Sequence, residues 1–183
     1  MSDTRPPRLP GDPPLADEVA AMIRVDHAGE YGAVRIYDGQ LAVLGRGRAR
    51  DEVTRMAEQE QRHLRAFDEL VRARRVRPTA LQPLWHIAGF ALGAATALLG
   101  ETAAMACTVA VEEVIDEHYQ GQLQRLGDND PALAETIARF RADELRHRDA
   151  AIEHGATETP GYELISAAIK TGSRLAIWLS ERL

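Results

Sequence analysis

Residues 53–70 carry a Glu-x-x-His motif on what the spacing predicts to be the apolar face of a helix. Glu60 and His63 continue a run of apolar residues at alternating intervals of three and four, which is typical of one helix face. The apolar members of this face are Val53, Met56, Phe67 and Leu70. An ionised carboxylate on such a face is costly to bury unless a partner neutralises it. A metal ion would bind both the carboxylate and the imidazole, so the stretch predicts a helix that carries metal ligands into the core.

The same motif occurs a second time, as Glu144-x-x-His147, on another apolar face. The apolar members of this face are Leu133, Ile137, Phe140 and Ala151. A chain with 16 Glu and 6 His contains about half a Glu-x-x-His match by chance, so one motif alone is weak evidence. Two motifs, both on apolar faces, favour a shared function.

Two further predicted helices each place one glutamate, Glu30 or Glu112, on an apolar face. Glu30 and Glu60 are 30 residues apart, and Glu112 and Glu144 are 32 residues apart. Thirty residues along one straight helix would span about 45 Å, so each pair can meet only if the chain folds back as a helical hairpin. Two such hairpins, similar in layout, predict a four-helix bundle.

No segment alternates with the period of a strand, so we expect an all-α protein with an apolar segment and a C-terminal helix added to the bundle. Residues 1–14 hold five prolines and no signal peptide, and we expect a disordered arm there, with a single domain over residues 15–183. Pro78 is expected to end the second helix. The predicted helices cover about residues 15–44, 51–75, 101–126, 131–154 and 162–183.

Charge and cysteine content narrow the class of protein. A net charge of −6 argues against a general nucleic-acid binder. Cys107 is the only cysteine, so the chain cannot form an internal disulfide, which suits a reducing compartment. Because Cys107 lies in a run of small and apolar residues, a buried core thiol is a better interpretation than a nucleophile.

Residues 78–100 contain no charged side chain. Their length would just span a bilayer, but Pro83, His86 and three glycines disfavour a membrane-spanning helix. We expect a short hairpin or an interfacial helix, with Trp85 at the level of the lipid headgroups and the preceding arginines on lipid phosphate. These arginines are Arg72, Arg74, Arg75 and Arg77. A buried core helix is the alternative interpretation.

The predicted bundle would bring four carboxylates and two imidazoles into one core. These candidate metal ligands are Glu30, Glu60, His63, Glu112, Glu144 and His147. Two divalent ions carry four positive charges, which four carboxylates neutralise. Nitrogen and oxygen donors without a thiolate disfavour structural zinc and fit iron or manganese, and iron with open positions can activate O₂. The competing interpretation is a set of surface salt bridges on a plain bundle.

Four segments of the chain are long enough to compare with known families: 24–33, 83–100, 106–113 and 179–183. They resemble the demethoxyubiquinone hydroxylases, the Coq7/CLK-1 family. The resemblance extends over nearly the whole chain from about residue 21, and the six candidate ligands match the family pattern without departure. Of the neighbours Glu112 and Glu113, Glu112 matches the family ligand, in agreement with the apolar spacing.

This resemblance implies a ferritin-like di-iron monooxygenase of ubiquinone biosynthesis. Such an enzyme would hydroxylate 5-demethoxyubiquinol at ring carbon 6, with O₂ as cosubstrate and NADH as the electron source. The implied ligands are Glu30 and His63 for one iron, Glu112 and His147 for the other, and Glu60 and Glu144 as bridges. The resemblance implies no catalytic residue beyond these ligands, and no nucleotide motif locates an NADH site.

The resemblance also implies peripheral binding to the membrane that holds the quinone. For a bacterial chain this is the cytoplasmic face of the inner membrane, which agrees with an interfacial role of residues 78–100. The sequence leaves open whether the chain forms a homo-oligomer or binds other ubiquinone-biosynthesis proteins.

Three questions stay open at this point. Iron storage or ferroxidase activity without an organic substrate would use the same ligands, although a soluble cage has no use for a lipid-facing patch. A non-catalytic helical bundle at the membrane would bind no metal. His118 and Tyr119 would either pass electrons or hold the quinone head, or would serve only as a surface histidine and a core tyrosine.

Overall fold

The computed structural model describes residues 14–183, and this part of the chain is helical throughout, without a strand. Its elements are α1 (Leu15–Val43), α2 (Arg48–Ala73), α3 (Gln82–Leu98), α4 (Glu101–Leu126), α5 (Pro131–Glu153), the short 3-10 helix η1 (Ala156–Glu158) and α6 (Tyr162–Arg182). The all-α prediction is confirmed. The predicted arm, residues 1–14, lies outside the described residues except for Pro14.

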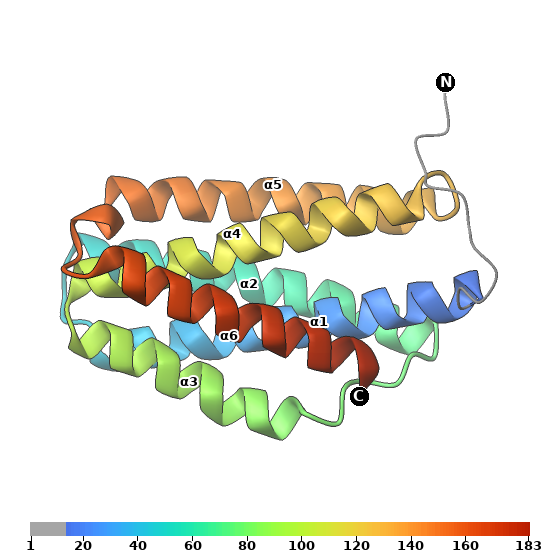
Figure 1. Ribbon diagram of the computed structural model, residues 1–183, viewed down its shortest axis with the longest axis horizontal. Helices are drawn as coiled ribbons and strands as arrows, with labels where there is room; N and C mark the ends of the chain where they lie inside the picture. Colours follow the sequence, from blue (N-terminus) through green and yellow to red (C-terminus); the bar gives the residue numbers. More distant parts are fainter. Residues whose placement is uncertain (1–13) are drawn as a thin grey trace.

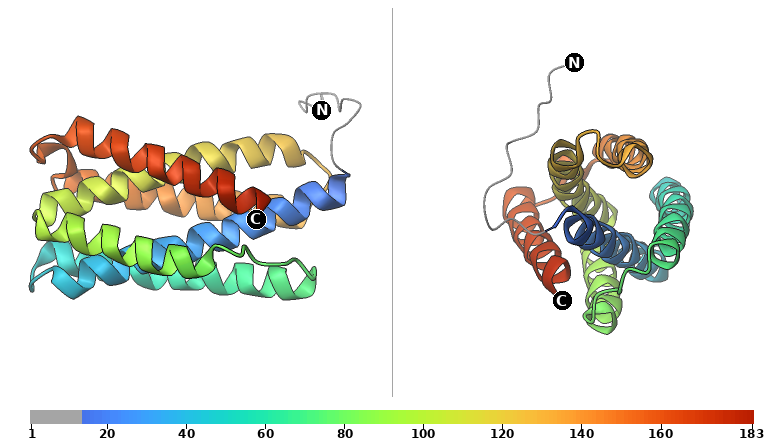
Figure 2. Two further views of the ribbon diagram at one scale, coloured as in Figure 1. Left: turned by 60° about the horizontal axis from the view of Figure 1, so that its bottom comes forward. Right: turned by 90° about the vertical axis from the view of Figure 1, so that its right-hand side faces the viewer.

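Four of the helices form an antiparallel bundle built from two hairpins (Figures 1 and 2). α1 and α2 make the first hairpin, and α4 and α5 make the second. α3 lies along α1, and α6 lies along both α4 and α1. The predicted bundle of two hairpins is therefore confirmed, with α3 and α6 as covering helices.

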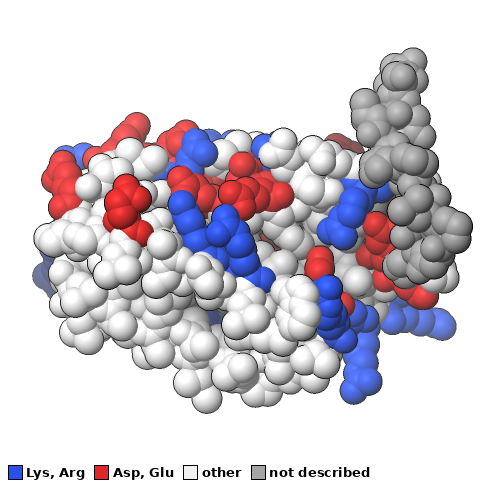
Figure 3. All heavy atoms as spheres, viewed as in Figure 1, with Lys and Arg blue, Asp and Glu red and all other residues white. Residues whose placement is uncertain are grey.

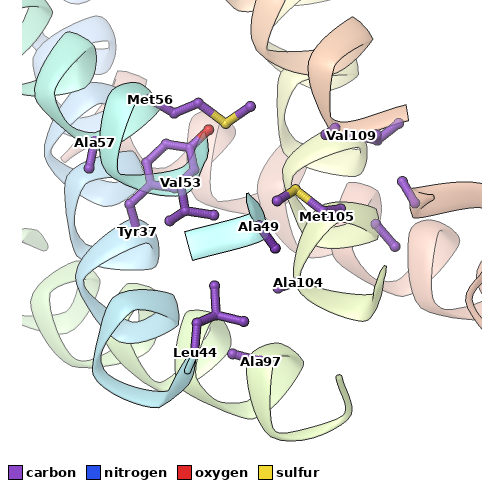
Figure 4. Close-up of a cluster of buried hydrophobic side chains, with 13 residues drawn as sticks. Tyr37, Leu44, Ala49, Val53, Met56, Ala57, Ala97, Ala104, Met105 and Val109 are labelled. Atoms are coloured by element: carbon purple, nitrogen blue, oxygen red, sulfur yellow. The ribbon is translucent and has the colours of Figure 1, made fainter. Parts of the chain in front are cut away.

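Apolar side chains fill the bundle at two levels along its axis. One cluster includes Tyr37, Val53, Met56 and Met105, whose side chains converge in Figure 4. The other cluster includes Ile23, Phe67, Leu133 and Ile137. Along each bundle helix the predicted metal ligands fall between residues of the two clusters, so apolar packing closes the core on both sides of them.

The turn before α5 follows the local signals in the sequence. Asp130 Oδ1 accepts the Leu133 N–H at 3.1 Å as a helix N-cap, and Pro131 is the first helical residue. The Asp-Pro pair therefore sets where the second hairpin turns back.

The end of α2 differs from the prediction. The helix ends at Ala73, before Pro78 is reached. Arg75 adopts a positive φ of 53°, and the Val76 N–H bonds to the Val71 carbonyl at 3.0 Å, which is the pattern of a Schellman C-cap. The expectation that Pro78 ends the helix is wrong because a backbone turn ends it first.

Glycines let α3 approach α1 closely. A Cβ at Gly93 would overlap the Ile36 backbone, and a Cβ at Gly39 would overlap the Phe90 backbone. A Cβ at Gly89 would lie 2.9 Å from the backbone oxygen of Gly32, which is also too close. Gly89 and Gly93 thus form a helix–helix contact with α1, a role that the sequence alone did not indicate.

The outer face of α3 is apolar and exposed. Its large hydrophobic side chains, with those of the residue that follows it, are between 51% and 75% exposed: Leu84, Ile87, Leu98 and Leu99. In Figure 3 the lower left part of the molecule, over α3, is almost free of charged side chains, whereas charged side chains lie along α6. The alternative of a buried core helix is therefore wrong, and so is a hairpin, because α3 is one continuous helix. Across residues 14–183, no helix combines the length and the hydropathy that a bilayer crossing requires.

The structure differs from the predicted membrane interface in two details. Trp85 is half-buried and donates its Nε1–H to Ser180 Oγ in α6 at 3.0 Å, so it joins the covering helices, whereas Trp178 is 51% exposed. Among the arginines before α3, Arg74 forms an ion pair with Asp130.

Candidate metal centre

The bundle brings the six predicted ligands together in its interior. α1 supplies Glu30, α4 supplies Glu112, and α2 and α5 each supply a Glu-x-x-His motif. No member of the set is more than 5% exposed. The interpretation as surface salt bridges is therefore wrong.

The six side chains form two overlapping groups of four. One group is Glu30, Glu60, His63 and Glu144, and the other is Glu60, Glu112, Glu144 and His147. Within each group, one donor atom from every residue lies within 4.8 Å of the others, close enough to hold a metal ion. Glu60 and Glu144 belong to both groups, as bridging ligands would. Metal binding at these positions stays a prediction.

Both imidazoles turn Nδ1 toward the carboxylates. His63 Nδ1 lies 3.0 Å from Glu144 Oε1 and 3.5 Å from Glu30 Oε2. His147 Nδ1 lies 3.0 Å from Glu60 Oε1 and 3.0 Å from Glu144 Oε2. Nδ1 is therefore the nitrogen available to a metal, and Nε2 carries the proton that faces away from the centre.

The outward nitrogens bind residues of the opposite hairpin. His63 Nε2 donates to Asp143 Oδ2 at 2.9 Å, and His147 Nε2 donates to Gln59 Oε1 at 3.3 Å. Sequence reasoning missed both acceptors. The available signal was their position, since each immediately precedes the glutamate of a Glu-x-x-His motif.

Two tyrosines hydrogen-bond the other glutamates, again across the hairpins. Tyr37 donates to Glu112 Oε1 at 2.9 Å, and Tyr119 donates to Glu30 Oε1 at 2.5 Å. Each tyrosine follows the glutamate of its own helix by seven residues, or two turns. No role at the centre was predicted for Tyr37 from the sequence.

The neighbours His118 and Tyr119 have different surroundings. Tyr119 is buried against the centre, and His118 is half-buried with its Nε2 3.2 Å from Asp26 Oδ1. Gln122 donates to the same Asp26 oxygen at 2.7 Å. His118 is therefore part of a polar network one layer outside the centre, and its proposed part in electron transfer or quinone binding stays a prediction.

Without a metal, burial and mutual repulsion oppose ionisation of the cluster. Burial raises the pKa of Glu60 and of Glu112 well above 4.5, and neighbouring carboxylates raise both further. Burial also raises the pKa of Glu144, but the two imidazoles outweigh it and lower this pKa to about 2. Burial lowers the pKa of His63, but contacts with carboxylates outweigh it and raise this pKa to about 9. The metal-free centre thus holds protons, which metal binding would release.

Unsatisfied donor atoms show that the residues fit a cation. Glu30 Oε2, Glu60 Oε1, Glu144 Oε1 and His63 Nδ1 are buried, and their imidazole–carboxylate contacts described above lack the geometry of a hydrogen bond. Each such atom costs about 1–3 kcal/mol when left unpaired. An ion at each position would satisfy these atoms, and a nitrogen and oxygen donor set without thiolate suits iron or manganese.

An apolar groove leads toward the centre between the covering helices. It measures about 490 Å³ and is lined by α1, α3, α4 and α6, including Ile36, Trp85, Leu92 and Ile169. A cavity of about 20 Å³ lies against all four candidate glutamates. Five residues line both spaces: Val25, Gly29, Ala33, Ile115 and Ile177. The groove therefore ends beside the carboxylates.

The fold and the donor set together define a ferritin-like helical bundle with a buried carboxylate and histidine cluster. The family described as ubiquinone biosynthesis protein COQ7 matches residues 17–180. The chain belongs to this COQ7 family, as the resemblance predicted.

The chain is similar to several named relatives over most of their length, and their names agree with this family. The chain is 59% identical over 177 residues to the 3-demethoxyubiquinol 3-hydroxylase of Rhodospirillum rubrum, covering 96% of this chain and 84% of the relative. It is 53% identical over 169 residues to the human NADPH-dependent 3-demethoxyubiquinone 3-hydroxylase, covering 90% and 78%. It is 42% identical over 200 residues to the 5-demethoxyubiquinone hydroxylase of Saccharomyces cerevisiae, covering 98% and 86%.

Proposed function

We propose that this protein hydroxylates demethoxyubiquinol in ubiquinone biosynthesis, the activity for which its relatives are named. One atom of O₂ would enter the ring position that lacks a methoxy group. The other atom would leave as water, with two electrons from a reduced nicotinamide nucleotide. The observation that carries this proposal is the pair of four-residue groups at the inner end of an apolar groove.

Two iron ions would occupy the centre. Glu30 and His63 would hold one ion, Glu112 and His147 the other, and Glu60 and Glu144 would bridge them. Bound iron would supply the activation of O₂ and the transfer of an oxygen atom. Four buried carboxylates would neutralise two divalent ions, and this charge balance supports two ions over one.

The groove would bind the quinone. Its walls are mainly apolar, which suits a ring with a polyprenyl tail. Gly29 and Ala33 present small side chains where the groove meets the cavity beside Glu30, so a flat ring could approach the centre there. The same apolar walls would keep water away from the reacting ring.

The nucleotide that donates the electrons would be NADH or NADPH. The family resemblance implies NADH, whereas the names of the mammalian relatives specify NADPH. Assays with each nucleotide under identical conditions would assign the donor for this chain.

The activity is tested by single turnover with ¹⁸O₂. Iron-loaded protein is reduced anaerobically and mixed with a short-tailed demethoxyquinol, and the product is analysed by mass spectrometry. We expect one ¹⁸O atom in the hydroxylated ring. Oxidation of iron without this product, with NADH and NADPH both supplied, would favour the ferroxidase alternative.

A groove variant adds a specific control. Ala33→Phe would narrow the junction between groove and cavity, so product should fall while iron content stays unchanged. Ala73→Phe, at the exposed end of α2, should leave both unchanged. Normal product formation in Ala33→Phe would exclude this route for the substrate.

We further propose peripheral binding to the cytoplasmic face of the inner membrane, through the apolar surface of α3 and α6. Besides the exposed residues of α3, the large exposed hydrophobic side chains here are Leu164, Leu175, Trp178 and Leu183. The uncharged surface over α3 in Figure 3 and the groove between α3 and α6 support this orientation. Exposed Arg72, Arg75 and Arg77 precede α3 and suit anionic headgroups.

Vesicle flotation tests the membrane proposal. The double variant Ile87→Ser and Leu98→Ser removes two side chains that are 69% and 75% exposed, so binding to anionic liposomes should weaken. Ile152→Ser, on α5 away from this surface, is the matched control and should bind normally. Equal flotation of both variants would exclude this surface as the anchor.

A further inference from the structure

The two Glu-x-x-His motifs are linked crosswise by hydrogen bonds outside the candidate centre. The residue before Glu144, Asp143, accepts the outward N–H of His63 on the opposite hairpin. The residue before Glu60, Gln59, accepts the outward N–H of His147 in the same way. The repeat therefore extends one residue beyond each motif and includes a support for the other motif's imidazole.

The two supports differ in charge and in rigidity. Asp143 is a buried carboxylate at 2.9 Å, and its second oxygen binds the guanidinium of Arg146. Gln59 is a half-buried neutral carboxamide at 3.3 Å. The equivalent of Arg146 in the first motif, Arg62, binds the backbone carbonyl of Glu58 instead of Gln59.

Packing adds to the difference between the imidazoles. His63 stacks on Phe140 with ring centroids 3.9 Å apart, so its ring plane is held on one face as well as at Nε2. His147 meets Tyr37 edge-on, with centroids 6.4 Å apart. His63 is thus the more firmly oriented of the two rings.

These differences act on metal binding through the ligand nitrogen. A carboxylate that accepts the outer N–H forms a charge-assisted bond, holds the imidazole in one tautomer and makes the metal-facing nitrogen a stronger donor. A neutral amide at a longer distance orients the imidazole less firmly and strengthens its metal-facing nitrogen less. Loss of such an outer partner typically weakens metal binding by about 10–100-fold.

We propose that Asp143 is a positioning residue that makes the two metal positions unequal, so that the position of His63 and Glu30 binds the first divalent ion. The inference rests on the proposed two-iron centre. The carboxylate acts only through His63, since Asp143 belongs to neither four-residue group.

Stepwise loading with iron tests the inequality. Metal-free full-length protein receives one equivalent of ⁵⁷Fe(II) under anaerobic conditions, followed by one equivalent of natural-abundance iron, and Mössbauer spectra are recorded. The wild type should show one dominant quadrupole doublet, because ⁵⁷Fe fills the tighter position. In Asp143→Asn the affinity of that position should fall by about 10–100-fold, so ⁵⁷Fe should divide between two doublets.

Two further variants separate positioning from general stability. Asp68→Asn removes a similar pair, His27 Nε2 to Asp68 Oδ1 at 3.0 Å, which joins α1 to α2 and includes none of the six candidate ligands, and should load like the wild type. Gln59→Glu leaves Asp143 in place and should tighten the position of His147. It should therefore also divide ⁵⁷Fe between two doublets, with total affinity raised and not lowered.

The outcomes distinguish this inference from the proposed function. Two equal doublets in the wild type, or a wild-type pattern in both Asp143→Asn and Gln59→Glu, would overturn the inference while leaving a two-iron centre intact. A wild-type protein that binds no iron would overturn both. If Asp143→Asn does not fold, division of ⁵⁷Fe between two doublets together with a raised total affinity in Gln59→Glu decides the question.

Discussion

The two hairpins of the bundle use the same parts for the candidate centre and different parts around it. Each has a glutamate on its first helix, a tyrosine seven residues later and a Glu-x-x-His motif on its second helix. The tyrosines and the imidazoles are each hydrogen-bonded across to the other hairpin. The comparison teaches that the candidate ligands are the same in both halves, whereas the residues that support them differ, most clearly at Gln59 and Asp143.

The two covering helices also differ in how they pack on the bundle. α3 meets α1 through a glycine contact so close that no side chain fits at Gly93. α6 packs on α4 through larger side chains such as Ile165 and Ile169. The space left between the two covering helices is the apolar groove, so an unequal pair of covers creates an access route that two equal close contacts would have closed.

The largest expected effect would come from removing a residue that both four-residue groups share. Glu60→Ala should abolish loading of both ions, because Glu60 is a donor at each position. Iron per chain after reconstitution, measured by elemental analysis, checks this. Glu58→Ala, exposed on the same helix, is the control, and normal iron content in Glu60→Ala would remove this residue from the centre.

A smaller effect is expected for the glutamates that belong to one group each. Glu30→Ala and Glu112→Ala should each retain about one ion per chain, because the bridging pair and one imidazole remain at the other position. Metal titration with elemental analysis distinguishes one ion from none. Complete loss in both variants would show that the two positions cannot fill independently.

The covering helices are compared by one glycine substitution in each. Gly93→Ala forces a Cβ into the backbone of α1 and should lower the free energy of unfolding by about 1–3 kcal/mol. Gly172→Ala, in α6 with nothing within 4 Å of the added Cβ, should raise it by about 0.5–1 kcal/mol. Urea denaturation of both variants measures the difference. Equal effects would mean that α3 is no more tightly packed than α6.

The smallest expected effect is a pH dependence of the metal-free protein. The pKa of His63 rises from 6.5 to about 9 on folding, so its stabilising contribution is complete below pH 6.5 and is lost as pH rises through 9. The raised pKa values of Glu60 and Glu112 act in the same direction above pH 4.5. The melting temperature should therefore fall by a few degrees between pH 6.5 and 9.

A pair of variants connects this pH dependence to the two halves. Glu60→Gln mimics the protonated side chain and should flatten the pH dependence of the melting temperature. Its counterpart Glu144, whose pKa is lowered to about 2, is ionised across this range and raises the pKa of His63, so Glu144→Gln should flatten the dependence through His63 and not by removing a titrating carboxyl group. An unchanged slope of melting temperature against pH in Glu144→Gln would show that Glu144 does not raise the pKa of His63.

Much of the architecture followed from periodicity. Polar residues on apolar helix faces are a local pattern, and the spacing of Glu30, Glu60, Glu112 and Glu144 required two hairpins. The pairing of Tyr37 with Glu112 could not be derived in the same way, because it depends on how two distant helices are rotated against each other. Trp85 illustrates the same limit, since only the docking of α6 turns this side chain from the surface toward Ser180.

From the order of residues alone came the helices, the bundle and the six candidate ligands, because an acid or an imidazole at a core position is recognisable within one helix. Contacts between helices decided the rest: the crosswise supports of Asp143 and Gln59, the glycine contact of α3 and the groove beside it. The physical reason is that a helix displays its own periodicity, but the neighbour of each side chain is set by packing between elements that lie far apart in the chain.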